Sequence, residues 1–247
     1  RSRTMQLVTG CNAGYLPRML PYLDSLREFA DFPVNFIGVG FEPPYLQGAT
    51  RSIYLDGMLN AGAPHETQCI QHGSFLNVLD APDSETLLYT DGDMVMQRKL
   101  DDEERAFLTL ENNEVVTGLN FGWHSTLIND AKLLGQQISD GELVERYGEY
   151  VNTHQDYNVG FLAMTRQTWQ MVYGAYMRDY PAICGVFTHM ARQQWLISWE
   201  IAKLGLTVKV CPWSIHAHGH GGLKPGMHYG EGGLWADGKL AAWRHHA

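Results

Sequence analysis

The stretch of the chain that indicates the fold most strongly reads Leu87-Leu88-Tyr89-Thr90-Asp91-Gly92-Asp93-Met94-Val95-Met96. Its first part is an apolar run typical of a buried strand, and a second apolar run follows the two carboxylates. Ligands of open α/β sheets bind beyond the carboxyl ends of the strands, so this turn lies where chemistry is expected. Two close carboxylates repel each other unless a proton or a cation intervenes, and a divalent metal ion that also binds a diphosphate would remove the repulsion. An Asp-Gly pair is also a favoured hairpin turn, and the sequence leaves both interpretations open.

Outward from this stretch, strand-like runs alternate with helical patterns. Short apolar runs predict strands over residues 5–8, 34–39, 87–89, 115–119, 159–164 and 207–210. The first strand is expected to break into a loop at Thr9-Gly10. A helix is expected to begin near Pro17 and to present one apolar stripe, and a second helix is expected over residues 190–204. The stripe of the first helix consists of Leu16, Leu20, Leu23, Leu26 and Ala30.

This alternation predicts an α/β fold with a mostly parallel sheet, in one domain that spans residues 1–247. The glycine-rich residues 219–247 are expected to form a flexible lid or tail. The chain has 45% hydrophobic and 18% charged residues, which excludes disordered and fibrous classes. Its formal net charge of −9 argues against broad binding of nucleic acid. The sequence contains no run of 18 apolar residues, so no membrane span is expected. Its four cysteines are widely spaced, which favours a reducing, cytoplasmic setting.

A second polar cluster lies near the C-terminus, in the segment Ile215-His216-Ala217-His218-Gly219-His220-Gly221-Gly222-Leu223-Lys224-Pro225. If this segment is extended, its three histidines point to the same side. Imidazole suits manganese and zinc, and Lys224 is a compact charge that can meet a phosphate group. A solvated loop and an adventitious zinc site are the alternatives. His245 and His246 are expected to be exposed at the end of the chain and to have no role.

The two clusters together resemble glycosyltransferase family 8, the glycogenin and galactosyltransferase-like group of GT-A fold. Asp91-Gly92-Asp93 resembles the DxD motif of GT-A enzymes, and the segment from His218 to Pro225 resembles the family's HxxGxxKP signature. The opening residues 7–17 and the central residues 157–162 are similar to further family segments, so the resemblance runs from about residue 5 to residue 227.

The resemblance implies a retaining, metal-dependent hexosyltransferase that uses a UDP-sugar donor and an unidentified hydroxyl acceptor. It implies that Mn²⁺ or Mg²⁺ is bound by Asp91, Asp93 and His218. The resemblance further implies one set of residues that binds the donor and another that lies near the sugar and the acceptor. The donor set consists of Thr9, Gly10, Cys11, Tyr15, Gly160, Gly221, Gly222 and Lys224, with Tyr15 stacked on uracil. The set near the sugar and the acceptor face consists of Asn158, Gln193 and Asp156.

The chain departs from the family pattern at two places. Arg192, Gln193, Gln194 and Trp195 stand where acidic residues are usual, and Gly226 replaces the aromatic residue that commonly follows the Lys-Pro pair. The altered stretch at residues 192–195 leaves a non-catalytic nucleotide-sugar-binding module as an alternative. The histidine run itself leaves a second alternative, a metal-dependent hydrolase built on His216, His218 and His220. A modified nucleic-acid base also remains open as an acceptor, whereas the identity of the hexose and the oligomeric state are not encoded in any recognisable pattern.

Overall fold

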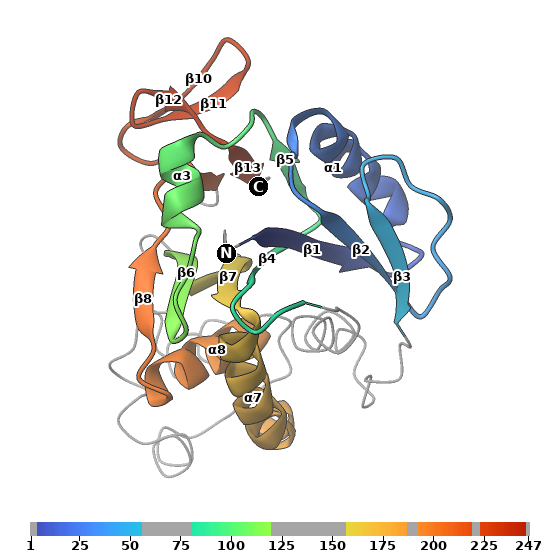
Figure 1. Ribbon diagram of the computed structural model, residues 1–247, viewed down its shortest axis with the longest axis vertical. Coiled ribbons are helices and arrows are strands. Elements are labelled where there is room, and N and C mark those ends of the chain that lie inside the picture. Colours follow the sequence, from blue (N-terminus) through green and yellow to red (C-terminus); the bar gives the residue numbers. More distant parts are fainter. Residues whose placement is uncertain (1–3, 56–80, 120–156, 187–191, 219–222, 246–247) are drawn as a thin grey trace.

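The computed structural model describes residues 4–55, 81–119, 157–186, 192–218 and 223–245. In this part of the chain a central sheet of seven strands has the order β3-β2-β1-β4-β7-β6-β8 (Figure 1). These strands are β1 (Met5–Cys11), β2 (Val34–Val39), β3 (Arg51–Leu55), β4 (Thr86–Thr90), β6 (Glu114–Leu119), β7 (Tyr157–Thr165) and β8 (Thr207–Val210). All neighbouring pairs are parallel except the two that β7 makes with β4 and β6. The prediction of a mostly parallel α/β sheet is therefore confirmed.

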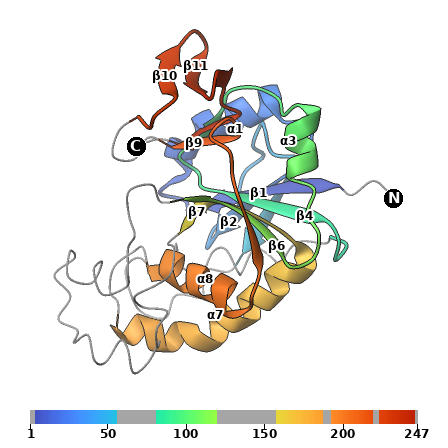
Figure 2. The same ribbon diagram turned by 90° about the vertical axis from the view of Figure 1, so that its left-hand side faces the viewer.

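Helices cover both faces of this sheet. Helices α7 (Arg166–Val186) and α8 (Arg192–Lys203) lie on one face, and α1 (Leu16–Phe29) lies on the other, as the sheet seen nearly edge-on in Figure 2 shows. The short helix α3 (Asp102–Phe107) lies on the same side as α1. Because both faces are covered, β2 and β4 are buried along their whole length, which is why they read as continuous apolar runs.

Two details of the predicted elements differ in the structure. Strand β1 continues to Cys11, so the expected loop at Thr9-Gly10 is wrong, since these residues still pair with β2. Helix α1 contains Pro17 in its first turn as predicted, but Leu20 on the expected apolar stripe is 44% exposed. Met19 and Tyr22 are buried instead, because they pack against the sheet and against β5.

The C-terminal part of the chain forms strands rather than the loop that its glycines indicate. Strands β10 (Met227–Gly230), β11 (Gly233–Ala236) and β12 (Lys239–Leu240) form one small antiparallel sheet. Strand β13 (Trp243–His245) lies between β5 (Met94–Met96) and β9 (His216–His218) in another. The tail is therefore fastened to the strand that directly follows the acidic turn.

Helix α7 is the longest element that the sequence patterns missed. Its 21 residues contain Gly174, Pro181 and Gly185, which weaken the helical signal. Helix α8 and the strands expected at residues 34–39, 87–89, 115–119, 159–164 and 207–210 are confirmed. None of the described helices is long and apolar enough to cross a membrane.

Candidate metal and nucleotide site

The acidic turn leaves the central sheet at the carboxyl end of β4. It joins two strands of different sheets, because β4 pairs with β1 and β7 whereas β5 pairs with β13. The hairpin interpretation of this Asp-Gly pair is therefore wrong. The backbone amide of Asp91 donates a hydrogen bond of 2.8 Å to the carbonyl group of Gly160 on β7, which fixes the turn against its neighbouring strand.

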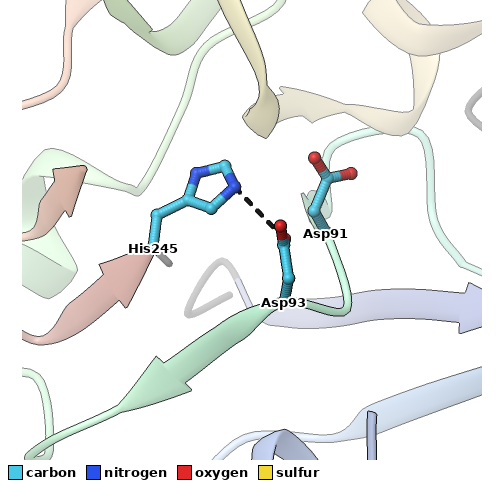
Figure 3. A group of neighbouring side chains, drawn as sticks. All are labelled: Asp91, Asp93 and His245. Atoms are coloured by element: carbon cyan, nitrogen blue, oxygen red, sulfur yellow. Dashed lines mark ion pairs between the residues drawn. The ribbon is translucent and has the colours of Figure 1, made fainter. Parts of the chain in front are cut away.

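A histidine from the end of the chain lies against this turn. His245 is the last residue of β13, and its Nε2 atom lies 3.2 Å from Oδ1 of Asp93 (Figure 3). One ligand atom from each of Asp91, Asp93 and His245 lies within 4.8 Å of the others, the one such group of metal-binding type among the described residues. Ligand atoms on one ion lie about 3 to 4.4 Å apart, so small side-chain adjustments would suit a divalent cation.

The expectation that His245 is exposed is wrong, because only 6% of its surface is accessible. The buried residues Ala241, Ala242 and Trp243 precede it, and Trp243 packs edge-on against Phe161 of the central sheet. This apolar run was the sequence signal that could have marked the position as a strand rather than a tail. His246 lies outside the described residues.

The charges around the turn favour a cation. Burial alone would lower the pKa of His245, but its bond to Asp93 and the charge of Asp91 outweigh burial and raise that pKa above 6.5. Burial and the charges of Asp93 and Asp91 raise the pKa of Tyr15 above its usual value of 10.0. The negative charge of the two aspartates contributes to both pKa shifts.

Gly160 lies against two of the three candidate ligands, Asp91 and His245. A Cβ atom at this position would lie 2.5 Å from Oδ2 of Asp91 and 3.0 Å from Cε1 of His245. Strand β7 is irregular here, since its register with β6 shifts between Thr117 and Gly118, and bulges of this kind are common next to active sites. A side chain at this position would therefore collide with the Asp91 carboxylate and crowd the His245 ring.

His218, the histidine that the resemblance assigns to the metal, lies one strand away. It is buried on β9, and its register partner on β13 is His245. The two rings are 6.2 Å apart at their centroids, and His218 does not belong to the group of three close ligands. The assignment of His218 as a ligand stays a prediction, whereas His245 is the histidine that lies at the aspartates.

His216 contacts the ring nitrogen of His245 that does not face Asp93. Its Nε2 atom is 3.3 Å from Nδ1 of His245, and its ring stacks on Phe161 at 4.7 Å between centroids. Burial, together with the neighbouring His245 and His218, lowers the pKa of His216 well below 6.5, so this ring is neutral. His220, the third member of the histidine run, lies outside the described residues.

The N-terminal donor positions also reach this end of the sheet. The ring of Tyr15 lies beside the turn, because a Cβ atom on Gly92 would be 3.4 Å from Cε1 of Tyr15. Thr9 is buried, and its hydroxyl group donates a 2.7 Å hydrogen bond to the carbonyl group of Thr90. Gly10 is equally enclosed, since a Cβ atom there would lie 2.4 Å from the carbonyl oxygen of Ile37. Thr9, Gly10 and the buried Cys11 therefore belong to a packed strand end.

Some of the remaining predicted site residues lie within the described part of the chain and others lie outside it. Lys224 is 9% exposed and precedes β10, whereas Gly221, Gly222 and Asp156 lie outside the described residues. Asn158 is buried on β7, and its side-chain oxygen accepts a 3.0 Å hydrogen bond from the amide of Gly160. Gln193 lies in the first turn of α8.

Comparison with known proteins gives a relative only at the level of structure. No protein-family profile matches the chain, and no curated protein sequence matches it. A crystal structure of the galactosyltransferase LgtC in complex with donor and acceptor sugar analogues matches with a TM-score of 0.58 and 9% identity. The structure of an active-site mutant of LgtC matches with a TM-score of 0.59 and 10% identity. Both matches cover 98% of this chain and 87% of the other.

The match covers nearly the whole chain, although few residues are identical. It confirms, at the level of fold, the resemblance that the two sequence motifs indicated. The chain therefore has the GT-A fold, which it shares with the galactosyltransferase LgtC.

Proposed function

We propose that the chain is a metal-dependent, retaining glycosyltransferase that moves a hexose from a UDP-sugar to a hydroxyl acceptor. The observation that carries the proposal is the meeting of Asp91, Asp93 and His245 beyond the carboxyl end of β4. In a GT-A fold this is the end of the sheet at which an open α/β protein binds its ligand. The solved relative was crystallised with donor and acceptor sugar analogues, which supports the same class of reaction here.

The two aspartates and His245 would hold Mn²⁺ or Mg²⁺. Mn²⁺ is the better fit, because Mg²⁺ prefers oxygen ligands alone and one ligand here is an imidazole. A bound divalent ion supplies electrostatic stabilisation of the diphosphate leaving group, with no proton transfer needed. His218 is close enough to His245 for either histidine to be tested as the third ligand.

The other positions then have separate tasks. Tyr15 lies beside the turn and would stack on the uracil base, while Lys224, with the backbone of Gly221 and Gly222, would bind the phosphate oxygens. Gly160 gives the donor close access to the backbone of β7. Asn158, Gln193 and Asp156 would line the sugar and acceptor side, where retention of the anomeric configuration is decided.

The alternatives have less support. A hydrolase built on the histidine run would need His216 as a metal ligand, yet this ring is stacked on Phe161 and lies behind His245. A non-catalytic nucleotide-sugar-binding module would use the same metal site. It differs in one observable property, because a transferase releases free UDP when an acceptor is present and a binding module does not.

The first experiment is a thermal-shift titration with UDP, GDP and ADP, each with Mn²⁺ and with a chelator. UDP at about 100 times its Kd is expected to add roughly 2.7 kcal/mol, and only when Mn²⁺ is present. For a chain of this length that is a rise in Tm of roughly 5 to 11 °C. A response to GDP or ADP alone would contradict the base assignment, and no response to any nucleotide would contradict the donor site.

Three variants test the ligands. Asp93→Ala and His245→Ala are expected to abolish the Mn²⁺-dependent shift with UDP. The exposed His228, which lies on β10 away from the acidic turn, gives the control variant His228→Ala, which is expected to keep it. If His218→Ala abolishes the shift and His245→Ala does not, the histidine ligand is His218.

A further inference from the structure

Tyr89 lies two residues before Asp91, so the two side chains are on the same face of the strand end. Its ring belongs to the core between the sheet and helices α7 and α8, and only 5% of its surface is exposed. Its hydroxyl group reaches the end of the strand and donates a hydrogen bond of 2.8 Å to Oδ1 of Asp91.

The direction of this hydrogen bond is set by its acceptor. The partner of Tyr89 is a carboxylate oxygen, which accepts hydrogen bonds, so the tyrosine hydroxyl group is the donor. A ring held in a packed core has little freedom, and its hydroxyl group is therefore a fixed point from which a carboxylate can be oriented.

The other oxygen of Asp91 lies toward Gly160, against which the His245 ring also lies. The position that a Cβ atom on Gly160 would occupy is 2.5 Å from Oδ2 of Asp91 and 3.0 Å from Cε1 of His245. Tyr89 thus contacts one carboxylate oxygen, while the second oxygen and the imidazole of His245 both lie against Gly160.

We propose that Tyr89 is a positioning residue of the metal site, whose hydroxyl group fixes Oδ1 of Asp91 so that Oδ2 faces the ion. The inference rests on the proposed function, because it assigns a partner to one of the proposed ligands. Ligating carboxylates are commonly oriented by such outer hydrogen bonds, and loss of one typically weakens metal binding by about 10-fold to 100-fold.

The test is the affinity of the full chain for Mn²⁺ alone, measured from the electron paramagnetic resonance signal of free Mn²⁺. Tyr89→Phe removes only the hydroxyl group and is expected to weaken binding about 10-fold or more. Tyr22→Phe is the matched control. Tyr22 is 1% exposed, and its hydroxyl group makes a 2.7 Å hydrogen bond with Thr90 on the other face of β4. Each variant loses one tyrosine hydroxyl hydrogen bond near the end of β4, and the two are expected to lose similar stability, but Tyr22→Phe is expected to keep the affinity of the parent.

A rescue variant keeps the inference falsifiable if the loss of a buried hydroxyl group loosens the fold. Incorporation of 4-aminophenylalanine at position 89 retains a donor on the same ring and is expected to restore Mn²⁺ affinity to within about 3-fold of the parent, the ordinary context dependence of one hydrogen bond. Failure of this variant to recover affinity would overturn the positioning role.

The remaining outcomes separate the two proposals. If the parent binds Mn²⁺ and Tyr89→Phe binds it equally well, the positioning role is overturned and the proposed function stands. If Tyr22→Phe loses as much affinity as Tyr89→Phe, the loss reflects general loosening, and the positioning role is again overturned. If the parent binds no Mn²⁺, both the positioning role and the metal-dependent function are overturned.

Discussion

At the scale of single residues, the candidate site depends on the absence of a side chain at position 160. Asp91 and Asp93 from the acidic turn and His245 from β13 come together, and Gly160 on β7 lies against Asp91 and His245. The site is therefore expected to be sensitive to one added carbon atom, even though no ligand is changed.

Gly160→Ala is expected to weaken Mn²⁺-dependent UDP binding at least 10-fold and to destabilise the protein by about 1 to 3 kcal/mol, because the new Cβ atom collides with Oδ2 of Asp91. Gly174→Ala on α7 is the matched control. No atom lies within 4 Å of its added Cβ atom, and alanine favours the helix by up to about 1 kcal/mol. Isothermal titration with UDP and Mn²⁺ checks the binding, and equal affinities of the two variants would contradict the role of Gly160.

His245 gives the site a pH dependence with two opposite signs. In the metal-free protein its raised pKa means that the proton stabilises the fold below the unfolded pKa, and this contribution is lost as the pH rises through the folded pKa. A metal ion requires the unprotonated ring, so Mn²⁺ affinity is expected to fall as the pH falls through the same raised pKa.

The measurement is a series of Mn²⁺ titrations between about pH 5.5 and pH 8, the range in which histidine changes its charge. The parent is expected to lose affinity steeply on the acid side of this range, and His245→Ala is expected to show weak and nearly flat binding. A parent affinity that does not change with pH would exclude His245 as a ligand.

At the scale of elements, the contact between α7 and α8 contains a carboxyl pair that serves no part of the proposed reaction. Glu200 on α8 is fully buried, and one of its oxygens is 3.7 Å from Arg178 on α7. Burial and the neighbouring charge of Asp179 raise the pKa of Glu200. Burial opposes ionisation of Asp179 as well, but its bonds with Arg178, Glu200 and Lys203 outweigh burial and lower its pKa.

Glu200→Gln is expected to stabilise the protein at alkaline pH by about 1 to 3 kcal/mol, because it removes a charge that is costly to bury. Since the folded pKa of Glu200 is raised, its contribution to stability is present below the unfolded pKa and is lost as the pH rises. The increase in the free energy of unfolding caused by Glu200→Gln should therefore vanish near about pH 4.5. Urea unfolding at alkaline pH and near about pH 4.5 checks this prediction. Glu103→Gln, at an exposed position, is the control. An equal gain in stability at both pH values would contradict the buried-charge explanation.

At the scale of the whole molecule, strand β13 fastens the end of the chain to its middle. It pairs with β5, which follows the acidic turn, and with β9, which carries His216 and His218. Trp243 on this strand has no exposed surface and contacts both Phe161 and Phe32. The stability of the fold and the position of His245 are therefore coupled through one three-residue strand.

Trp243→Ala is expected to cost about 3 to 5 kcal/mol and to lower Tm by roughly 6 to 20 °C, because it leaves a cavity beneath the metal site. The partly exposed Trp235 on β11 is the control, and Trp235→Ala is expected to change Tm by only a few degrees. Scanning calorimetry measures both. Similar losses in the two variants would contradict the anchoring role of β13.

The sequence by itself determined the α/β alternation, the buried β4 and the acidic turn at its end, because apolar periodicity and a pair of carboxylates are local signals. It also predicted Asp91 and Asp93 as metal ligands and indicated the resemblance to GT-A enzymes. It could not indicate which histidine lies at the two aspartates, since His218 is part of a recognisable motif and His245 is part of a glycine-rich tail. Only the tertiary structure decided which histidine lies at Asp93, because β13 enters a sheet between strands more than one hundred residues apart and brings His245 there. Pairing between such distant segments is fixed by shared burial, which no local pattern records.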